Sequence, residues 1–365
     1  MRAVSAVLGV LLAAAALFDV WTTILHPDGE GPIARLVRSA VWRASSRAAT
    51  RWPAAGRRLL AHAGPLLLAG TLLVWMALLN LGVALIVWSN LDGYHAIDGA
   101  GRLGFVDALY YTVGTTTVLG YGDILPTTTP SKLLGVVVAA LGFTLFTGLT
   151  TYLIQVINGL AVRNQFALAV HDQTQGLGGA GVVARSLAEE GVESARRRCE
   201  EWAESLRALA DIVHRYPIAA LTYRSSRRIY DLEPVLHQLA EACVAALLAA
   251  RAEPWRGLNL AAEQLSRALL RLQETIADRY LPADTAARLN APHTTDPDQA
   301  IVARINRLLV DRLGPEYTLP PPHDDLAAEM ASRSRIFLES LWSWAGPGVA
   351  AQRPDRPDTP TGPGQ

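Results

Sequence analysis

The chain alternates between long apolar runs and segments that carry charged side chains. Three runs stand out, at residues 3–25, 64–88 and 133–160, and the second and third contain no charged residue. A helix rises about 1.5 Å per residue and the hydrocarbon core of a bilayer is about 30 Å thick, so each run can span a membrane. The pattern therefore predicts three transmembrane helices. Asp19 is the one charged side chain in the first run, and we expect it to make a structural contact near the helix end, with a role in permeation as the alternative.

Arginine residues between the first two runs predict how the helices are oriented. This segment contains Arg35, Arg38, Arg43, Arg47, Arg51, Arg57 and Arg58. Because short loops rich in Lys and Arg stay in the cytoplasm, residues 89–130 are expected outside and everything after Arg163 inside. A cleaved signal peptide is the competing interpretation of residues 3–25. It would place the arginines outside, and the run has no good small-residue cleavage site.

Part of this arginine-rich segment also has helical spacing. Residues 33–51 place apolar side chains and arginines at near-helical intervals. Such a pattern is typical of a basic helix that lies on the inner leaflet. We expect Arg35, Arg38 and Arg43 to attract anionic lipid headgroups. The alternative is a solvated linker helix that only fixes the topology.

A different pattern occupies the segment between the second and third runs. Residues 105–114 read FVDALYYTVG and begin a predicted helix of about 12 residues, some 18 Å long and too short to span a bilayer. Asp107 near its start suits the positive end of a helix. The next stretch, residues 115–126, reads TTTVLGYGDILP, and its Gly120 and Gly122 can adopt positive φ without steric cost. Alternating backbone twists would turn successive carbonyls to one side, where four copies of the loop could coordinate a dehydrated cation.

These two motifs together resemble a known family. F-x-D-A-L-Y-Y followed by T-T-x-x-G-Y-G-D-I-x-P, between two apolar runs, is similar to the pore module of bacterial potassium channels of the two-transmembrane ion-channel family, over about residues 66–159. The resemblance implies a homotetramer in the bacterial inner membrane that conducts K+ passively and needs no cofactor. It assigns the ion-binding filter to Thr117, Val118, Leu119, Gly120, Tyr121 and Gly122. It also places Asp123 at the outer mouth, and it suggests a gating hinge at Gly142, for which simple packing of a small residue is the alternative.

The sequence departs from the family at one filter position. In an alignment without a gap, Val118 stands where the family has a threonine, and Leu119 takes the hydrophobic position that follows. An alignment that keeps Thr117 as the family threonine must insert Leu119, which would shift every later carbonyl. We prefer the ungapped alignment, because a missing hydroxyl disturbs one ion site only. A potassium-selective channel is the first expectation, and a poorly selective monovalent cation channel or a non-conducting scaffold with a vestigial pore are the alternatives.

The rest of the chain has the pattern of a helical bundle. Apolar residues recur at helical intervals from residue 182 to about 280, and residues 301–313 form another short helix. Residues 176–181 read GLGGAG, which formally matches a nucleotide-binding motif but lacks the flanking strand, so we expect a flexible linker. Residues 291–298, with two prolines, are expected to be a second linker. The bundle could gate the pore by a signal that the sequence does not identify.

Composition and charge complete the prediction. Only 18% of the residues are charged and the net charge is zero, which favours a membrane protein and gives no reason to expect nucleic-acid binding. Cys199 and Cys243 have no partner spacing for a disulfide framework or zinc site, and no nucleophile–base pair suggests an enzyme. We therefore expect an all-α membrane protein with three transmembrane helices, a re-entrant pore helix and a filter loop. The expected division is residues 1–62 (first helix and basic helix), 63–160 (pore domain), 161–345 (cytoplasmic helical domain) and 346–365 (disordered tail).

Overall fold

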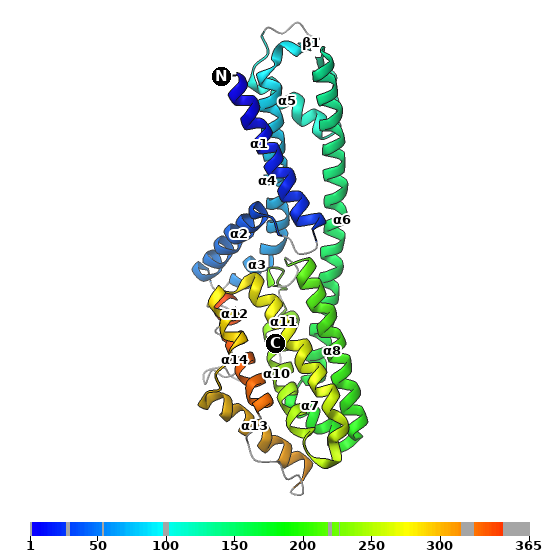
Figure 1. The fold of residues 1–365 in the computed structure, drawn as a ribbon, viewed down its shortest axis with the longest axis vertical. Coiled ribbons are helices and arrows are strands. Elements are labelled where there is room, and N and C mark those ends of the chain that lie inside the picture. Colours follow the sequence, from blue (N-terminus) through cyan, green and yellow to red (C-terminus); the bar gives the residue numbers. More distant parts are fainter. Residues whose placement is uncertain are drawn as a thin grey trace. The chain divides into compact units, whose positions relative to one another are not determined.

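The computed structural model describes residues 2–26, 30–52, 55–97, 102–217, 221–225, 227–314 and 325–345 (Figure 1). The predicted tail, residues 346–365, lies outside the described residues. The chain forms two compact units. The first comprises Met1–Arg43 and Pro65–Ile157, and the second comprises Ala44–Gly64 and Asn158–Gln365.

The three predicted apolar runs all form helices. They are α1 (Arg2–Val20, prolonged by the π-helical turn η1, Trp21–Leu25), α4 (Ala63–Ser89) and α6 (Thr129–Thr174). α6 continues well beyond the predicted end at residue 160. The basic segment forms α2 (Pro32–Arg51), and a short α3 (Gly56–Ala61) precedes α4.

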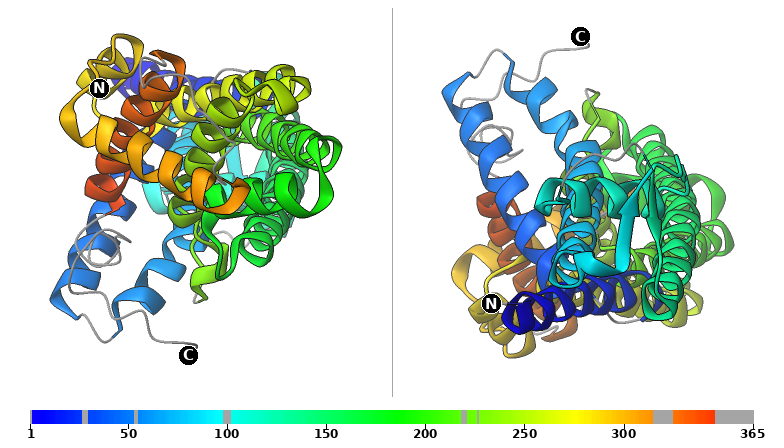
Figure 2. Two further views of the ribbon diagram at one scale, coloured as in Figure 1. Left: turned by 90° about the horizontal axis from the view of Figure 1, so that it is seen from below. Right: turned by 90° about the horizontal axis from the view of Figure 1, so that it is seen from above.

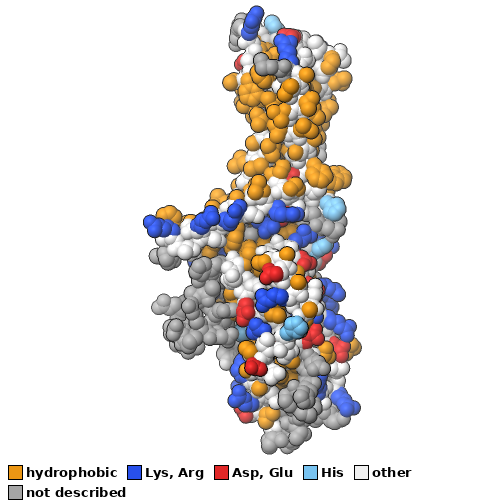
Figure 3. Space-filling view, turned by 60° about the vertical axis from the view of Figure 1, so that its left-hand side comes forward, with side chains coloured by type: hydrophobic (Ala, Val, Ile, Leu, Met, Phe, Trp, Pro, Cys, Tyr) orange, Lys and Arg blue, Asp and Glu red, His pale blue; other side chains and the backbone are white. Residues whose placement is uncertain are grey.

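Close contact between helix backbones holds the first unit together. α1 crosses α4 at two glycines: a Cβ added at Gly9 would lie 2.4 Å from the Gly82 carbonyl oxygen. Small residues allow such an approach between membrane helices. Next to this crossing, Ala16 of α1 and Leu79 and Val83 of α4 belong to one buried cluster. The outward sides of these helices remain apolar and exposed, as Figure 3 shows for one face.

The structure also contains elements that the sequence pattern did not predict. β1 (Tyr94–Ala96) and β2 (Ile124–Pro126) form an antiparallel pair in which His95 faces Leu125 (Figure 2). Among the described residues, four helices rather than three are long and apolar enough to cross a membrane. The fourth is α10 (Leu232–Ala249), of which 78% is buried inside the second unit. α10 therefore serves as the core helix of a bundle.

The second unit is the predicted helical bundle. Its further elements are α7 (Gly178–Arg185), η3 (Ser186–Glu190), α8 (Val192–Arg215), η4 (Arg228–Tyr230), η5 (Glu253–Leu258), α11 (Asn259–Tyr280), α12 (Ala283–Asn290), α13 (Asp296–Leu313) and α14 (Asp325–Ala345). α10 packs against α7, α11 and α14, and α8 packs along α11. Cys199 and Cys243 are buried free thiols in this core, and burial raises the pKa of Cys199 to about 12.

The expectation of a flexible glycine linker at residues 176–181 was wrong. α7 begins at Gly178, and a Cβ added at Gly179 would lie 1.8 Å from the Gln238 carbonyl oxygen. The Gly179 N–H donates a hydrogen bond of 2.6 Å to Oε1 of Gln238. Gly179 is therefore needed because α7 and α10 touch backbone to backbone at this position.

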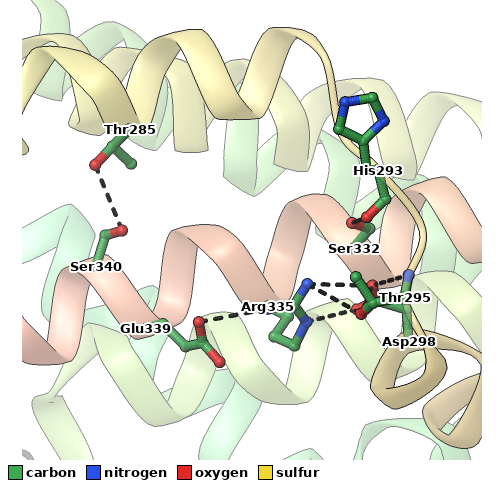
Figure 4. Close-up of polar contacts among 8 residues, drawn as sticks. All are labelled: Thr285, His293, Thr295, Asp298, Ser332, Arg335, Glu339 and Ser340. Carbon is green, nitrogen blue, oxygen red and sulfur yellow. Dashed lines mark hydrogen bonds and ion pairs between the residues drawn. The ribbon is translucent and has the colours of Figure 1, made fainter.

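The expected linker at residues 291–298 is likewise shorter and more ordered than predicted. α13 starts at Asp296, and Asp298 accepts hydrogen bonds from the backbone N–H and hydroxyl of Thr295, at 2.9 and 2.7 Å. Arg335 of α14 donates to the same carboxylate at 2.7 Å (Figure 4). Ser332 donates to the His293 carbonyl at 3.1 Å, so α14 holds this segment at two points.

Candidate functional site

The site begins with α5 (Phe105–Thr116), which has the predicted length of 12 residues. The Gly104 N–H donates to Oδ2 of Asp107 at 2.7 Å, so the predicted acidic residue caps the helix start. The hydroxyls of the last threonines bond back to carbonyls one turn earlier. Thr115 bonds to Tyr111 at 2.8 Å and Thr117 to Val113 at 2.7 Å. The Thr117 hydroxyl is thus engaged inside the helix end.

The helix ends in a Schellman motif centred on Val118. The N–H of Val118 donates to the Thr115 carbonyl at 3.1 Å, and the N–H of Leu119 donates to the Gly114 carbonyl at 2.9 Å. Such a motif needs a left-handed residue, usually glycine, just after the helix. Here Val118 takes that conformation with φ of 60°. For a β-branched residue this backbone is strained by roughly 1–2 kcal/mol, which the sequence alone did not reveal.

Beyond Val118 the backbone alternates. Gly120 has φ of 55° and Gly122 has φ of 78°, as their predicted freedom requires, and with Val118 they place positive φ at every second residue. A Cβ added at Gly120 would meet nothing within 4 Å. A glycine is therefore needed at position 120 because of its backbone conformation, since the surrounding space would accommodate a larger side chain.

The large side chains of this loop are mostly exposed. Val118, Leu119 and Tyr121 are 59%, 60% and 70% exposed. The Tyr121 ring stacks on Tyr110 of α5, with centroids 6.2 Å apart and planes inclined by 9°. Large exposed apolar side chains that lie together are typical of interaction surfaces.

The C-terminal end of the loop is fixed by the small sheet. The Asp123 carbonyl accepts a hydrogen bond from the Ile97 N–H at 2.9 Å, next to the β1–β2 pair. The carboxylate of Asp123 accepts from its neighbour Ile124 at 3.1 Å and is exposed. The loop is therefore held at both ends, by the Schellman motif and by the sheet, while its middle makes few contacts.

α6 lies directly against α5. A Cβ added at Gly142 would lie 2.0 Å from the Thr116 carbonyl oxygen, and one added at Gly135 would lie 2.8 Å from the Tyr111 hydroxyl. α6 is helical without interruption through this region. The contact gives Gly142 a packing role at the end of α5, and a hinge at Gly142 stays a prediction.

Asp19 makes the structural contact expected near the end of the first helix. Its carboxylate is 1% exposed and accepts hydrogen bonds from the backbone N–H of Ile33 at 2.7 Å and of Ala34 at 3.0 Å. It also accepts from the indole of Trp75 at 2.7 Å. Asp19 therefore caps the start of α2 and joins α1, α2 and α4.

One of the three expected lipid-binding arginines is engaged elsewhere. Arg38 is 9% exposed and forms two hydrogen bonds to the Glu30 carboxylate, at 2.8 and 2.9 Å. The buried guanidinium of Arg38 is thus paired with a carboxylate of its own chain and does not face lipid. Arg35 and Arg43 are exposed. Within the described ranges, no cluster of His, Cys, Asp or Glu could hold a metal ion.

Comparison with known proteins gives two matches and one absence. Residues 74–158 match the family model described as an ion channel. An uncharacterized membrane protein of Bacillus subtilis (strain 168), YdjJ, is 30% identical over 172 residues, which cover 46% of this chain. The match spans about half of that relative, 49% of its length. No solved structure matches. The membrane-protein relative and the apolar helices support a location in a membrane, and residues 74–158 are similar to an ion-channel domain.

Proposed function

We propose that the protein is a homotetrameric potassium channel of the bacterial inner membrane, with its helical bundle in the cytoplasm. α5 acts as a re-entrant pore helix, and backbone carbonyls of residues 117–122 replace the water shell of K+. Ions then pass down their gradient without a chemical reaction. The observation that carries the proposal is the alternation of positive φ at Val118, Gly120 and Gly122, directly after a helix too short to span a bilayer.

The need for four copies follows from what one chain supplies. One loop offers one set of carbonyls, whereas a dehydrated cation needs a ring of oxygens around it. The exposed side chains of the loop and the exposed apolar residues of α6, such as Phe143 and Phe146, are available for contact with neighbouring subunits. Irregular backbone inside a membrane is stable only where protein or an aqueous path surrounds it.

A potassium flux assay on purified protein in liposomes tests the proposal. We expect flux from the wild-type protein and background flux from Gly120→Ala, since alanine at a φ of 55° disfavours the required backbone. Cross-linking in the same liposomes should give tetramers. Monomeric protein, or a wild-type flux that equals the protein-free background, would contradict the proposal.

A poorly selective monovalent cation channel is the second candidate. Val118 has no hydroxyl, and the hydroxyl of Thr117 is already bonded to the Val113 carbonyl at 2.7 Å. The innermost ion site would then rely on carbonyls alone. Reversal potentials in mixed K+ and Na+ separate the two candidates. A non-conducting scaffold, the third, predicts no flux from well-folded tetramers.

Anionic lipid is the proposed partner of α2. Arg35, Arg43, Arg47 and Arg51 are exposed on this helix, and each arginine near an anionic surface contributes up to about 1 kcal/mol of attraction. Figure 3 shows basic side chains along α2 on the face it draws. Channel flux and vesicle binding that do not depend on the anionic lipid content would contradict this partner.

A further inference from the structure

A cluster of buried polar groups in the second unit involves the first residues of α4, the second half of α6, residues 223–224 and residues 231–233. Arg163 of α6 is 4% exposed, and its Nη1 donates a hydrogen bond of 2.6 Å to the carbonyl of Tyr223. Two further donors of the same guanidinium bond to Oδ1 of Asn164, at 3.2 and 3.0 Å. The guanidinium of Arg163 is thereby held in one orientation.

The ring of Tyr223 makes the second contact of the cluster. A Cβ added at Gly64, in the first turn of α4, would lie 2.6 Å from atoms of that ring. Burial of the phenol raises the pKa of Tyr223 to about 12. Tyr223 therefore contacts α6 through its carbonyl and the start of α4 through its ring.

Two ion pairs fix the rest of the segment. Arg224 pairs with Glu233 in the first turn of α10, and both side chains are almost fully buried. Arg57 of α3 donates to Oδ2 of Asp231 at 2.8 Å, just before α10 begins. Separating such buried pairs exposes each charge to an unfavourable apolar environment, so the segment resists displacement.

A cavity next to the cluster makes these contacts more important for joining α6 to α10. It has a volume of about 380 Å³ and is lined by His171 and Thr174 of α6, by Asp231, and by Pro234 and Gln238 of α10. The cavity lies between the end of α6 and the first turns of α10, so side chains do not fill the space between these two helices there. The connection at this level therefore depends more strongly on the hydrogen bonds and ion pairs of the cluster.

We propose that Tyr223, Arg224, Asp231 and Glu233, together with Arg57, Gly64 and Arg163, form a clamp that fixes the bundle-side ends of both pore helices. The clamp sets the spacing between the start of α4 and the second half of α6, and it ties both to α10. Motion of the bundle is thereby transmitted to the pore through two continuous helices. Its residues are positioning residues that act on the pore at a distance. This inference rests on the proposed channel function.

The first test places a methyl group under the Tyr223 ring. Gly64→Ala should change the potassium flux per tetramer by about threefold or more, within the range of coupling effects seen for residues remote from a site. Gly70→Ala on the same helix is the matched control and should leave flux unchanged, since its Cβ would make an ordinary 3.5 Å contact with Val37. Wild-type flux in Gly64→Ala would overturn the clamp.

The second test approaches the clamp from α6. Arg163→Gln should shift flux in the same direction as Gly64→Ala, and Arg163→Lys, which keeps the charge and a donor toward Tyr223, should restore most of it. Arg185→Gln, at a surface pair with Glu189, is the control and should have no effect. Opposite shifts in Gly64→Ala and Arg163→Gln, or no rescue by lysine, would contradict a shared clamp.

Amide hydrogen exchange separates failure of the clamp from failure of the channel. In the full-length protein, the amides of α6 from residue 158 to 170 should exchange about threefold faster or more in Gly64→Ala and Arg163→Gln than in the wild type. This readout does not require conduction. Unchanged exchange overturns the clamp even in a conducting protein, whereas absent wild-type flux with accelerated exchange refutes only the channel.

Discussion

Two stretches of this chain use glycine in ways that look alike in the sequence and differ in the structure. Residues 118–122 of the first unit and residues 176–181 of the second both contain glycines with positive φ, at Gly120 and Gly178 for example. Around Gly120 there is nothing within 4 Å of an added Cβ, whereas at Gly179 an added Cβ would lie 1.8 Å from a carbonyl oxygen. Gly120 provides backbone freedom in the loop, whereas Gly179 provides space for a close helix contact in the bundle.

The two stretches also differ in where their hydrogen-bond and packing partners lie. The bundle stretch finds its partners within its own unit, because the Gly179 N–H bonds to Gln238 of α10. The loop is fixed at its two ends, and Val118 and Leu119 between them are 59% and 60% exposed. We therefore expect substitutions at residues 176–181 to affect mainly stability, and substitutions at residues 118–122 to affect mainly function.

The largest expected effect is the loss of conduction in Gly120→Ala. The substitution meets no atom but strains a residue with φ of 55°, so flux should fall to background while the thermal unfolding midpoint of the full-length protein changes little. Flux in liposomes and unfolding followed by tryptophan fluorescence measure the two effects. A variant that conducts normally would show that the loop backbone does not carry the ions.

Gly179→Ala should, in contrast, mainly lower the stability of the fold. An added methyl 1.8 Å from the Gln238 carbonyl forces α7 from α10, and overpacking of this kind lowers the free energy of unfolding by about 1–3 kcal/mol. Gly257→Ala, whose Cβ would lie 3.8 Å from Val192, is the control. Equal stability of the two variants would remove the distinction between a packing glycine and a conformational one.

The capping carboxylate of α13 should make the bundle sensitive to acid. Burial tends to raise the pKa of Asp298, but hydrogen bonds from Arg335 and Thr295 outweigh it and hold the pKa below its ordinary value. A lowered carboxyl pKa stabilises the fold above the unfolded value of about 3.9, and this contribution is lost as the pH falls through the folded pKa. Stability should therefore decline below about pH 4.

Asp298→Asn tests this dependence. The variant should lose about 1–3 kcal/mol of unfolding free energy at pH 7, because Arg335 keeps Glu339 but loses its nearer charged partner, and its stability should vary less with acid pH. Asp211→Asn, at an exposed pair with Arg215, is the matched control and should behave like the wild type. An acid profile that is identical in Asp298→Asn and the wild type would show that another group controls it.

The smallest expected effect concerns selectivity. Val118→Thr adds a hydroxyl without changing the branching at a residue with φ of 60°, so the K+ over Na+ permeability ratio should rise a few-fold, about 1 kcal/mol of discrimination. Thr117→Val is the control, since that hydroxyl is bonded to the Val113 carbonyl. Reversal potentials measure both. If Thr117→Val lowers the ratio and Val118→Thr does not raise it, the gapped alignment is the correct one.

The sequence by itself determined the three long apolar helices, the short helix between the second and third, and their order. The apolar runs predict α1, α4 and α6, and the FVDALYY stretch predicts α5 to its length of 12 residues, because periodicity and capping are local properties. The positive φ of Gly120 and Gly122 followed from residue type in the same way.

Only the tertiary structure decided which residues meet. The three partners of Asp19, the contact of Gly142 with Thr116, the β1–β2 pair and the burial of Gly179 all join segments far apart in the chain. The left-handed conformation of Val118 also required the structure, since residue type alone argues against it. Local pattern specifies which elements form, whereas steric fit and hydrogen bonding between distant segments specify how those elements contact one another, and periodicity holds no information about that fit.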